Sequence, residues 1–272
     1  MLIDIPGGRF RMGLEVEQEE RLRRRSGGLS PFPFHTEKPA HEVTVRPFRI
    51  WRTPVTNAKY AAFVEAGGYQ HDAYWTALLE EQELDGASVR RSFVDGTGRP
   101  GPLTWRDGRP PEGKEQHPVS GVSWFEAQAF CAYMKLRLPT EDEWEFAARG
   151  TDGRLYPWGN DFDSSRCTHE GLPAPDTVPV ESMPEGKSPF GVLHMSGNVA
   201  EWVEDRYQPH PGSGPHPGRT GALDRVVRGD FYRGNADSLR ATVRTPHSPE
   251  ERFAGLGFRC ASDFTLTGMR NY

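Results

Sequence analysis

Cysteine is scarce in this chain, which has only three cysteines among 272 residues. An odd number excludes a scaffold in which every cysteine is paired in a disulfide, and their spacing contains no CxxC zinc or redox motif. Positive charge is not in excess either, since 33 Lys and Arg oppose 38 Asp and Glu and give a net charge of −5. We therefore expect no nucleic-acid partner, because no overall basic field attracts one.

Long hydrophobic runs are also missing from the sequence. No apolar stretch approaches the roughly 20 residues that a membrane-spanning helix requires. The first ten residues, MLIDIPGGRF, lack the basic region and the long apolar region of a secretory signal. The sequence therefore predicts a cytoplasmic protein with no membrane partner.

Familiar catalytic motifs are absent from the whole sequence. The nine histidines form no HxH or HExxH pair, and there is no GxSxG elbow, Walker loop or GxGxxG after a strand. Acidic residues cluster at Glu141, Asp142 and Glu143, but the first turn of a helix explains carboxylates there. These absences leave no preformed zinc or iron site and no catalytic triad to propose.

Glycine and proline, in contrast, are abundant. The chain contains 30 Gly and 24 Pro, about one residue in five, while 35% hydrophobic residues supply enough apolar material for a sizeable core. No internal repeat divides the chain. These features predict a folded α+β protein in which loops, rather than the faces of sheets, carry the function.

Three helices and several short strands are predicted from periodicity and capping signals. The helices begin after Thr56, after Ser123 and at Thr140, where Glu143 completes a capping box that opens a helix ending at Gly150. The predicted strands span residues 2–5, 9–12, 41–50, 200–203, 225–227, 239–244 and 257–261. Loops are expected over residues 77–118, 151–190 and 208–222. The basic run Arg21–Arg25 is expected to be a solvated loop, neutralised by the preceding acidic residues.

Two aromatic motifs carry chemical information, YPWGN at residues 156–160 and MSGNVAEWVEDRY at residues 195–207. In the second, the carboxylate of Glu201, the nearby Asn198 and the loop carbonyls could hold a hard cation such as Ca²⁺. The alternative is a buried carboxylate that accepts hydrogen bonds from turn amides. The residues alone leave both interpretations open.

Motifs along the whole chain resemble those of the formylglycine-generating-enzyme (sulfatase-modifying factor) family. They are IPGGRFRMG (5–13), TPVTNAKYAAFV (53–64), HPVSGVSWFEAQAFCAYMKLRLPTEDEWEFAARG (117–150), YPWGN, GNVAEWVEDRY and LGFRCA (256–261). The resemblance implies an elaborated C-type lectin fold: a single, loop-rich α+β domain over residues 1–272 with few helices and short antiparallel strands.

The activity of the family does not follow from its fold. The oxidases that this chain resembles bind copper through two cysteines after an RGGSW-like motif, but the corresponding residues 225–244 contain no cysteine. Because no other residue present there replaces a thiolate, we do not expect this chain to generate formylglycine. Cys131 and Cys260 match structural positions of the family and are expected to lie close together.

The calcium site that the resemblance implies is matched only in part. Gly197, Val199 and Glu201 keep the pattern, but His194 stands where the family usually has Asp or Asn, and imidazole is a poor calcium ligand. A structural Ca²⁺ is thus an expectation, and no other cofactor is required.

The C-terminal segment 225–261 also resembles variable proteins of diversity-generating retroelements, in which a fixed framework presents a diversified binding surface. The corresponding positions here are Asp230, Phe231, Tyr232, Arg233, Gly234, Asn235, Ser238, Thr242, Thr245, Pro246, His247, Ser248, Phe253, Ala254 and Gly255. None is Lys, Glu, Gln, Met or Trp, the residue types that diversification of AAC codons through adenine cannot produce.

Three functions remain from the sequence, of which one is a structural regulator with no ligand of its own; the other two are more specific. The first is a non-enzymatic protein that presents these residues to a protein or other macromolecular ligand, because Tyr, Phe and Arg anchor interfaces while Ser, Gly and Asn adapt around them. The second is a metal-dependent oxidoreductase acting on a thiol or other small substrate. An ordinary surface loop, with Phe231 and Tyr232 partly in the core, is the simpler structural alternative.

Overall fold

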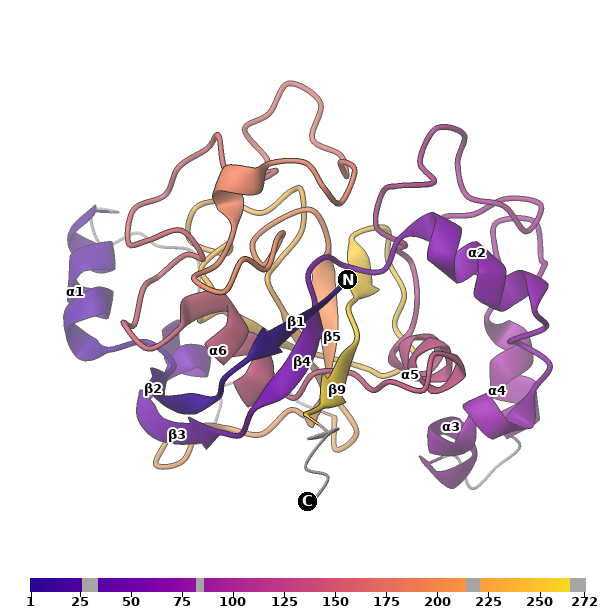
Figure 1. Ribbon diagram of the computed structural model, residues 1–272, viewed down its shortest axis with the longest axis horizontal. Coiled ribbons are helices and arrows are strands. Elements are labelled where there is room, and N and C mark those ends of the chain that lie inside the picture. The colour runs from indigo at the N-terminus through magenta and orange to yellow at the C-terminus, as the bar shows by residue number, and fades with distance from the viewer. Residues whose placement is uncertain (26–33, 82–85, 214–220, 265–272) are drawn as a thin grey trace, which may run out of the picture.

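Short strands form three small sheets in the computed structural model, which describes residues 1–25, 34–81, 86–213 and 221–264 (Figure 1). One sheet has the order β1-β4-β9 and a second pairs β2 with β3; their bounds are Leu2–Ile5 (β1), Gly8–Met12 (β2), His41–Val45 (β3), Phe48–Trp51 (β4) and Ala261–Asp263 (β9). The third has the order β7-β6-β5-β8, with bounds Ala200–Arg206 (β5), Arg225–Arg228 (β6), Arg244–His247 (β7) and Leu256–Phe258 (β8). All pairs are antiparallel except β5 with β8.

Helices flank these sheets on two sides, with α1 and α6 on one side and α2 to α5 on the other (Figure 1). Their bounds are Val16–Arg25 (α1), Asn57–Glu65 (α2), Thr76–Glu81 (α3), Gly86–Ser92 (α4), Trp124–Tyr133 (α5) and Glu141–Arg149 (α6). Short 3-10 turns span Phe34–Glu37, Asp72–Tyr74 and Pro184–Gly186. No helix in the described part of the chain is long and apolar enough to cross a membrane.

The three predicted helices are confirmed as α2, α5 and α6, and side-chain caps fix their first turns. Thr56 caps α2, while Ser123 with Glu126 and Thr140 with Glu143 form complete capping boxes at α5 and α6. These caps satisfy backbone N–H groups that the helix itself leaves unpaired. In the first turn of α6, Glu141 and Glu143 are buried, whereas Asp142 is exposed.

The predicted loop at Arg21–Arg25 was wrong, because these residues form the second half of α1. Arg23 pairs with Glu19 at 2.7 Å one turn earlier, and the basic residues occupy the end of the helix that its dipole favours for cations. Leu22 is buried and attaches the helix to the molecule. The short helices α3 and α4 were likewise missed within the expected loop 77–118.

Three strand predictions need correction. The predicted strand 41–50 is divided at Pro47 into β3 and β4, which pair in different sheets. Residues 239–243 form turns, and the strand begins only at Arg244. The predicted strand 257–261 falls across the end of β8 and the start of β9. The expected loop 208–222 is described only in part, since residues 214–220 lie outside the described residues.

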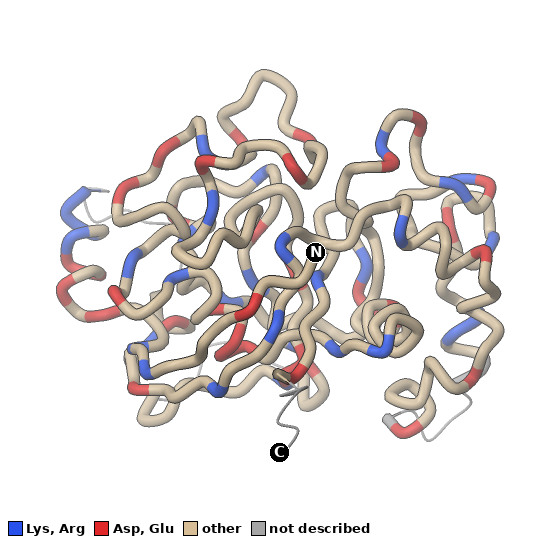
Figure 2. The backbone as a smooth tube through the Cα atoms, in the orientation of Figure 1, with Lys and Arg blue, Asp and Glu red and all other residues tan. Residues whose placement is uncertain are grey.

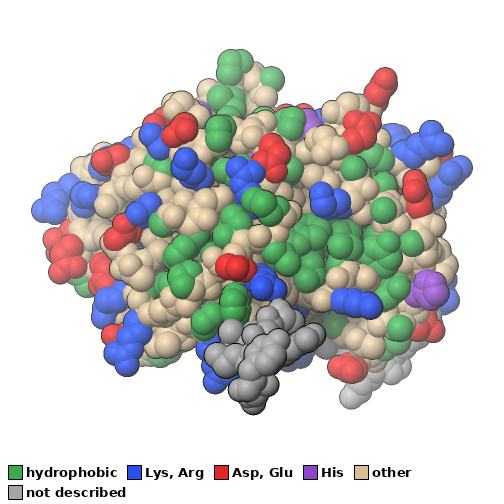
Figure 3. Space-filling view, viewed as in Figure 1, with side chains coloured by type: hydrophobic (Ala, Val, Ile, Leu, Met, Phe, Trp, Pro, Cys, Tyr) green, Lys and Arg blue, Asp and Glu red, His purple; other side chains and the backbone are tan. Residues whose placement is uncertain are grey.

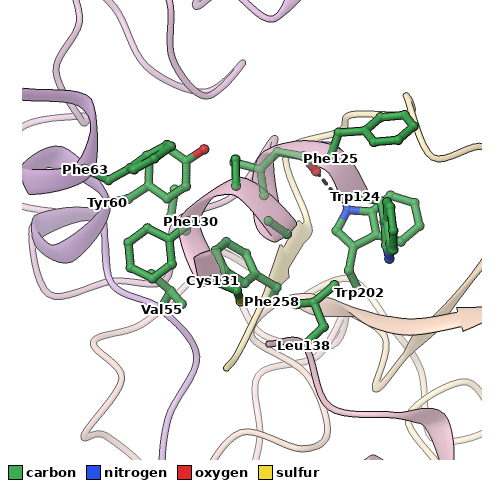
Figure 4. Packing of buried hydrophobic residues seen from close by; sticks show 14 of the residues in the cluster. Val55, Tyr60, Phe63, Trp124, Phe125, Phe130, Cys131, Leu138, Trp202 and Phe258 are labelled. Carbon is green, nitrogen blue, oxygen red and sulfur yellow. Dashed lines mark hydrogen bonds between the residues drawn. The ribbon is translucent and has the colours of Figure 1, made fainter. Parts of the chain in front are cut away.

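Two hydrophobic clusters account for most of the core. One packs α2 and α5 against β8, with Tyr60, Phe63, Phe130 and Phe258 in mutual aromatic contact (Figure 4). The other packs α6 against the N-terminal strands. Charged residues of both signs alternate along the chain (Figure 2), and apolar side chains gather on the face between the N-terminus and α2 (Figure 3).

Candidate ligand-binding surface

Buried arginines fix both ends of segment 225–244. On β6, the Arg228 guanidinium donates to Glu141 at 2.8 Å and also to Glu145, both from α6. At the start of β7, Arg244 donates to both oxygens of Glu141 at 2.7 Å. Burial would raise the pKa of both carboxyls, but the adjacent guanidiniums outweigh it. Arg228 and Arg149 lower the pKa of Glu145 to about 2, and Arg244 and Arg228 lower that of Glu141.

A third buried carboxylate, from outside the segment, holds the turn that precedes β7. Glu37 is completely buried and accepts hydrogen bonds from Arg240 at 2.6 Å and from the Thr242 hydroxyl. Thr242 was predicted to lie in the binding surface, and this prediction was wrong because its side chain is buried in this contact. The partners Glu37, Glu141 and Glu145 were not predicted from the sequence, although any buried arginine requires a nearby acceptor.

Ser238 is a second position that does not belong to the surface. Its side chain is buried, and its hydroxyl accepts a hydrogen bond from the Asn235 N–H at 2.9 Å. The Asn235 side chain in turn accepts from the backbone N–H groups of Asp237 and Ser238 at 2.9 and 3.1 Å. These contacts close a tight turn, so Ser238 shapes the loop without reaching solvent.

Glu201, the expected calcium ligand, is already fully paired inside the protein. Its oxygens accept hydrogen bonds from Arg259 at 2.6 and 2.7 Å, and from the Trp144 indole at 2.8 Å. The carboxylate therefore has an internal cation and does not fit a calcium ligand set in this arrangement. Among the described residues there is no group of three or more His, Cys, Asp or Glu suited to a metal ion.

Backbone contacts explain the other two residues of the calcium pattern. The Gly197 N–H donates to the Gly229 carbonyl at 3.0 Å, and its φ of +76° suits glycine. Val199 is buried. His194 is buried near Arg259, and burial followed by that positive charge lowers the pKa of its imidazole to about 4. This loop is thus held by contacts within the chain. The Glu201 carboxylate is buried as the alternative predicted, but its donors are a guanidinium and an indole rather than turn amides.

The aromatic side chains of the loop 230–235 lie next to Phe253. The Phe231 ring lies 5.2 Å from Tyr232 and 5.7 Å from Phe253, measured between ring centroids. Gly255 lies directly beneath this contact, where an added Cβ would come within 2.2 Å of the Phe231 ring. Only glycine at this position allows the two segments to approach so closely.

Most of the predicted surface positions reach solvent. Those exposed are Arg233, Ser248 and Ala254, and those half-buried are Asp230, Phe231, Asn235, Thr245, Pro246, His247 and Phe253. Tyr232, Gly234 and Gly255 are buried with Ser238 and Thr242. Tyr232 is buried and Phe231 packs half-buried against the hydrophobic cluster around α5, so the alternative of residues partly in the core describes both.

Two cavities lie on either side of the aromatic pairs. The first has a volume of about 170 Å³ and is lined by Ala200, Val227, Gly229, Asp230, Phe231, Val243, Thr245, His247 and Phe253. The second, of about 130 Å³, is more polar and is lined by Asn57, Thr104, Pro111, Lys114, Pro118, Ser120, Asp176, Thr177, Tyr232 and Ala254. The wall between the two cavities is thus formed by two pairs of consecutive residues, Phe231 with Tyr232 and Phe253 with Ala254. The apolar lining from β5, β6 and Val243 was not predicted, because no local pattern brings these strands together.

All three cysteines of the chain are buried. The sulfur atoms of Cys131 and Cys260 lie 3.2 Å apart in the hydrophobic cluster around α5, so their expected proximity is confirmed. Burial raises the pKa of Cys167 to about 12 and that of Cys131 well above its usual range. No thiol of this chain therefore combines exposure with thiolate character, the combination that reactive cysteines require.

Comparison of sequences shows the relatives of this chain. Residues 1–264 match the family described as the sulfatase-modifying factor enzyme 1-like domain. The chain is 34% identical over 287 residues to "Inactive C-alpha-formylglycine-generating enzyme 2" of Mus musculus, covering 96% of this chain and 85% of that protein. It is 35% identical over 299 residues to "Formylglycine-generating enzyme" of Streptomyces coelicolor, with 97% and 90% covered.

Comparison of structures gives the fold. PvdO from Pseudomonas aeruginosa superposes with a TM-score of 0.69 at 24% identity, covering 97% of this chain and 94% of that one. Treponema denticola variable protein 1 superposes with a TM-score of 0.62 at 19% identity, covering 96% and 94%. The predicted loop-rich α+β architecture of the formylglycine-generating-enzyme and C-type lectin type is thereby confirmed.

Proposed function

We propose, from the premise that this chain belongs to the sulfatase-modifying factor enzyme 1-like family, that it is a non-enzymatic protein which binds a macromolecular ligand. The single observation that carries the proposal is the surface at residues 230–235, 245–248 and 253–255. There, the aromatic side chains of Phe231 and Phe253 and the polar side chains of Asp230, Thr245 and His247 help to line an apolar cavity of about 170 Å³. Interfaces are anchored by such residues when they enclose well-packed pockets.

Rigid support strengthens this proposal. The strands next to the surface are held by the buried contacts of Arg228 and Arg244 with Glu141. A surface held in place before the ligand arrives loses less conformational entropy on binding, which favours affinity. Because the supporting contacts do not involve the exposed side chains, those side chains can be exchanged without loss of the fold.

The absence of a suitable cysteine pair argues against the family's oxidase chemistry in this chain. Segment 225–244 contains no cysteine, and the only close pair, Cys131 with Cys260, lies inside the core. A copper site made of two accessible thiolates therefore does not fit these residues. A related mouse protein carries the word "Inactive" in its name, which agrees with loss of activity within the family.

Within this proposal, the chain is a variable protein of a diversity-generating retroelement. The coding DNA provides the test, because such a system keeps an unaltered template copy of the variable segment near a reverse-transcriptase gene. We expect a near-copy of the region that encodes residues 225–261, differing from it mainly at adenines. A complete genomic neighbourhood without such a copy would remove this part of the proposal.

The second candidate function is a metal-dependent oxidoreductase, and the relatives favour it. The Streptomyces coelicolor relative is named a formylglycine-generating enzyme. A Mycolicibacterium smegmatis relative, named hercynine oxygenase, is 32% identical, and this chain spans 60% of its length. Metal analysis of the purified protein followed by oxygen uptake with thiol substrates separates the two functions. Thiol-dependent uptake with a bound redox metal would establish the oxidoreductase and contradict a purely binding role.

A further inference from the structure

Asp230 lines the apolar cavity and has no cation of its own. Other buried carboxylates of the protein have a guanidinium partner. Glu37 pairs with Arg240 at 2.6 Å, and Glu201 pairs with Arg259 at 2.6 Å. Over the described part of the chain, Asp230 forms no ion pair. Its carboxylate accepts hydrogen bonds from the Phe231 N–H at 2.8 Å and from the Ser238 hydroxyl, and it packs over Gly234. Burial raises the pKa of this carboxyl, as expected for a carboxylate withdrawn from water without a positive partner.

Nearby cations do not supply that partner. Arg252 lies 3.0 Å from Glu126 in the interior and donates to the backbone carbonyls of Gly101 and Gly121. Arg233 is exposed and lies over the Tyr232 ring on the other side of the wall. His247, which also lines the cavity, has its Nδ1 3.0 Å from Glu251. Among the residues that line the cavity, Asp230 is thus the one carboxylate, and no Lys or Arg accompanies it.

Aromatic rings form two walls of the same cavity. The Phe231 and Phe253 rings are 5.7 Å apart at an angle of 64°, and His247 lies 5.7 Å from Phe253. The volume of about 170 Å³ slightly exceeds the roughly 150 Å³ of a cavity known to hold benzene. The two rings touch edge to face, so a flat group of that size stacks against them from the cavity, where Asp230 also contributes to the lining.

We infer that this cavity receives a basic side chain of the ligand, with an arginine guanidinium stacked on the cavity-facing side of Phe231 and Phe253 and paired with Asp230. The planar guanidinium stacks on aromatic faces and donates two parallel hydrogen bonds to a carboxylate, whereas a neutral group of the same shape satisfies only the stacking. Val227 and Val243 contact the methylene stem of such a side chain. The inference rests on the proposed function and specifies the chemistry of its central contact.

N-acetyl-arginine amide and its neutral counterpart N-acetyl-citrulline amide test the inference directly. Each is titrated into the full chain while the methyl signals of Ala200, Val227 and Val243 are followed by NMR. We expect arginine to move these signals and to bind about tenfold more tightly than citrulline, because a hydrogen bond to a charged group is stronger than a neutral one. Equal affinities would overturn the basic anchor but leave the surface as a ligand site.

Variants test whether the Asp230 carboxylate causes the preference for arginine over citrulline. Asp230→Asn is expected to bring the ratio of the two affinities close to one, and asparagine tolerates the local φ of +49°. Thr245→Lys places a cation at the rim of the cavity and should also abolish arginine binding. The matched control, Glu65→Gln, removes an exposed carboxylate of α2 and should keep the preference. Retention of the preference in a folded Asp230→Asn protein would overturn the assignment, as would the absence of methyl shifts with either probe.

Discussion

Substitution of Glu141 by glutamine should destabilise the protein strongly, because this carboxylate neutralises two buried arginines. It accepts hydrogen bonds from Arg228 at 2.8 Å and from two nitrogens of Arg244 at 2.7 Å. Arg228 would keep Glu145 as a partner. Among the described residues, Arg244 would lose its one carboxylate partner and keep the Gln208 carbonyl, at 2.8 Å, and the face of the Tyr207 ring.

The cost follows from the environment of Arg244, which is almost completely buried. Removal of one partner of a buried ion pair typically costs about 3–5 kcal/mol. Since the Gln oxygen still accepts one hydrogen bond, we expect the lower part of this range, about 3 kcal/mol in the free energy of unfolding. For a chain of this size, that corresponds to a decrease of roughly 6–12 °C in the melting temperature.

Urea denaturation followed by circular dichroism measures this change without adding salt. The control is Glu42→Gln, which removes a carboxylate from an exposed pair with Arg9 at 3.5 Å and should change stability by less than about 0.5 kcal/mol. The dependence of the unfolding free energy on urea should remain the same in both variants. A loss below about 1 kcal/mol for Glu141→Gln would show that the buried ion pairs do not hold segment 225–244 in place.

Three further predictions concern the calcium loop, a buried histidine and the exposed surface. Glu201→Gln should lower the melting temperature because Arg259 loses its carboxylate. Added Ca²⁺ should leave the melting temperature of the wild type unchanged, and a rise would establish a cation site. His194 has a folded-state pKa of about 4, below its unfolded value, so its contribution is complete above the unfolded pKa and is lost as the pH falls. At pH 5 the loss should be about 2 kcal/mol, and His194→Gln should remove it; an unchanged dependence of stability on pH in that variant would refute the assignment. Arg233→Ala should leave the free energy of unfolding within about 0.5 kcal/mol of the wild-type value, because its side chain is exposed. Phe231→Ala should cost more. A large loss for Arg233→Ala would show that the exposed surface and the buried contacts beneath it are not separate.

Local signals predicted those parts of the fold that depend on neighbouring residues. The capping residues Thr56, Ser123 and Thr140 locate the first turns of α2, α5 and α6, because a cap acts within three residues of itself. Pro47 indicated an irregular strand, but only the three-dimensional pairing shows that β3 and β4 belong to different sheets. Helix α1 was missed because its strongly charged sequence has little apolar periodicity.

The candidate site was predicted from resemblance, and the structure changes its content. Thr242 lies in the same segment as the exposed positions, yet its partner Glu37 is more than 200 residues away in the sequence. The apolar lining of the cavity likewise combines Ala200 and Val227 from different strands. Contacts between residues so distant in sequence leave no local pattern, so they could not be predicted from spacing or periodicity.

The central claim is that residues 230–235, 245–248 and 253–255 form the binding surface. The most direct measurement is the affinity of peptides, selected on the wild-type chain from a displayed random library, for three proteins: wild type, a Phe231→Ala/Phe253→Ala double variant, and Leu103→Ala. Leu103 is an exposed leucine that lines neither of the two cavities and serves as the control. We predict a loss of at least about tenfold for the double variant alone, since two anchoring rings are removed. Equal affinity for the wild type and the folded double variant would contradict the claim.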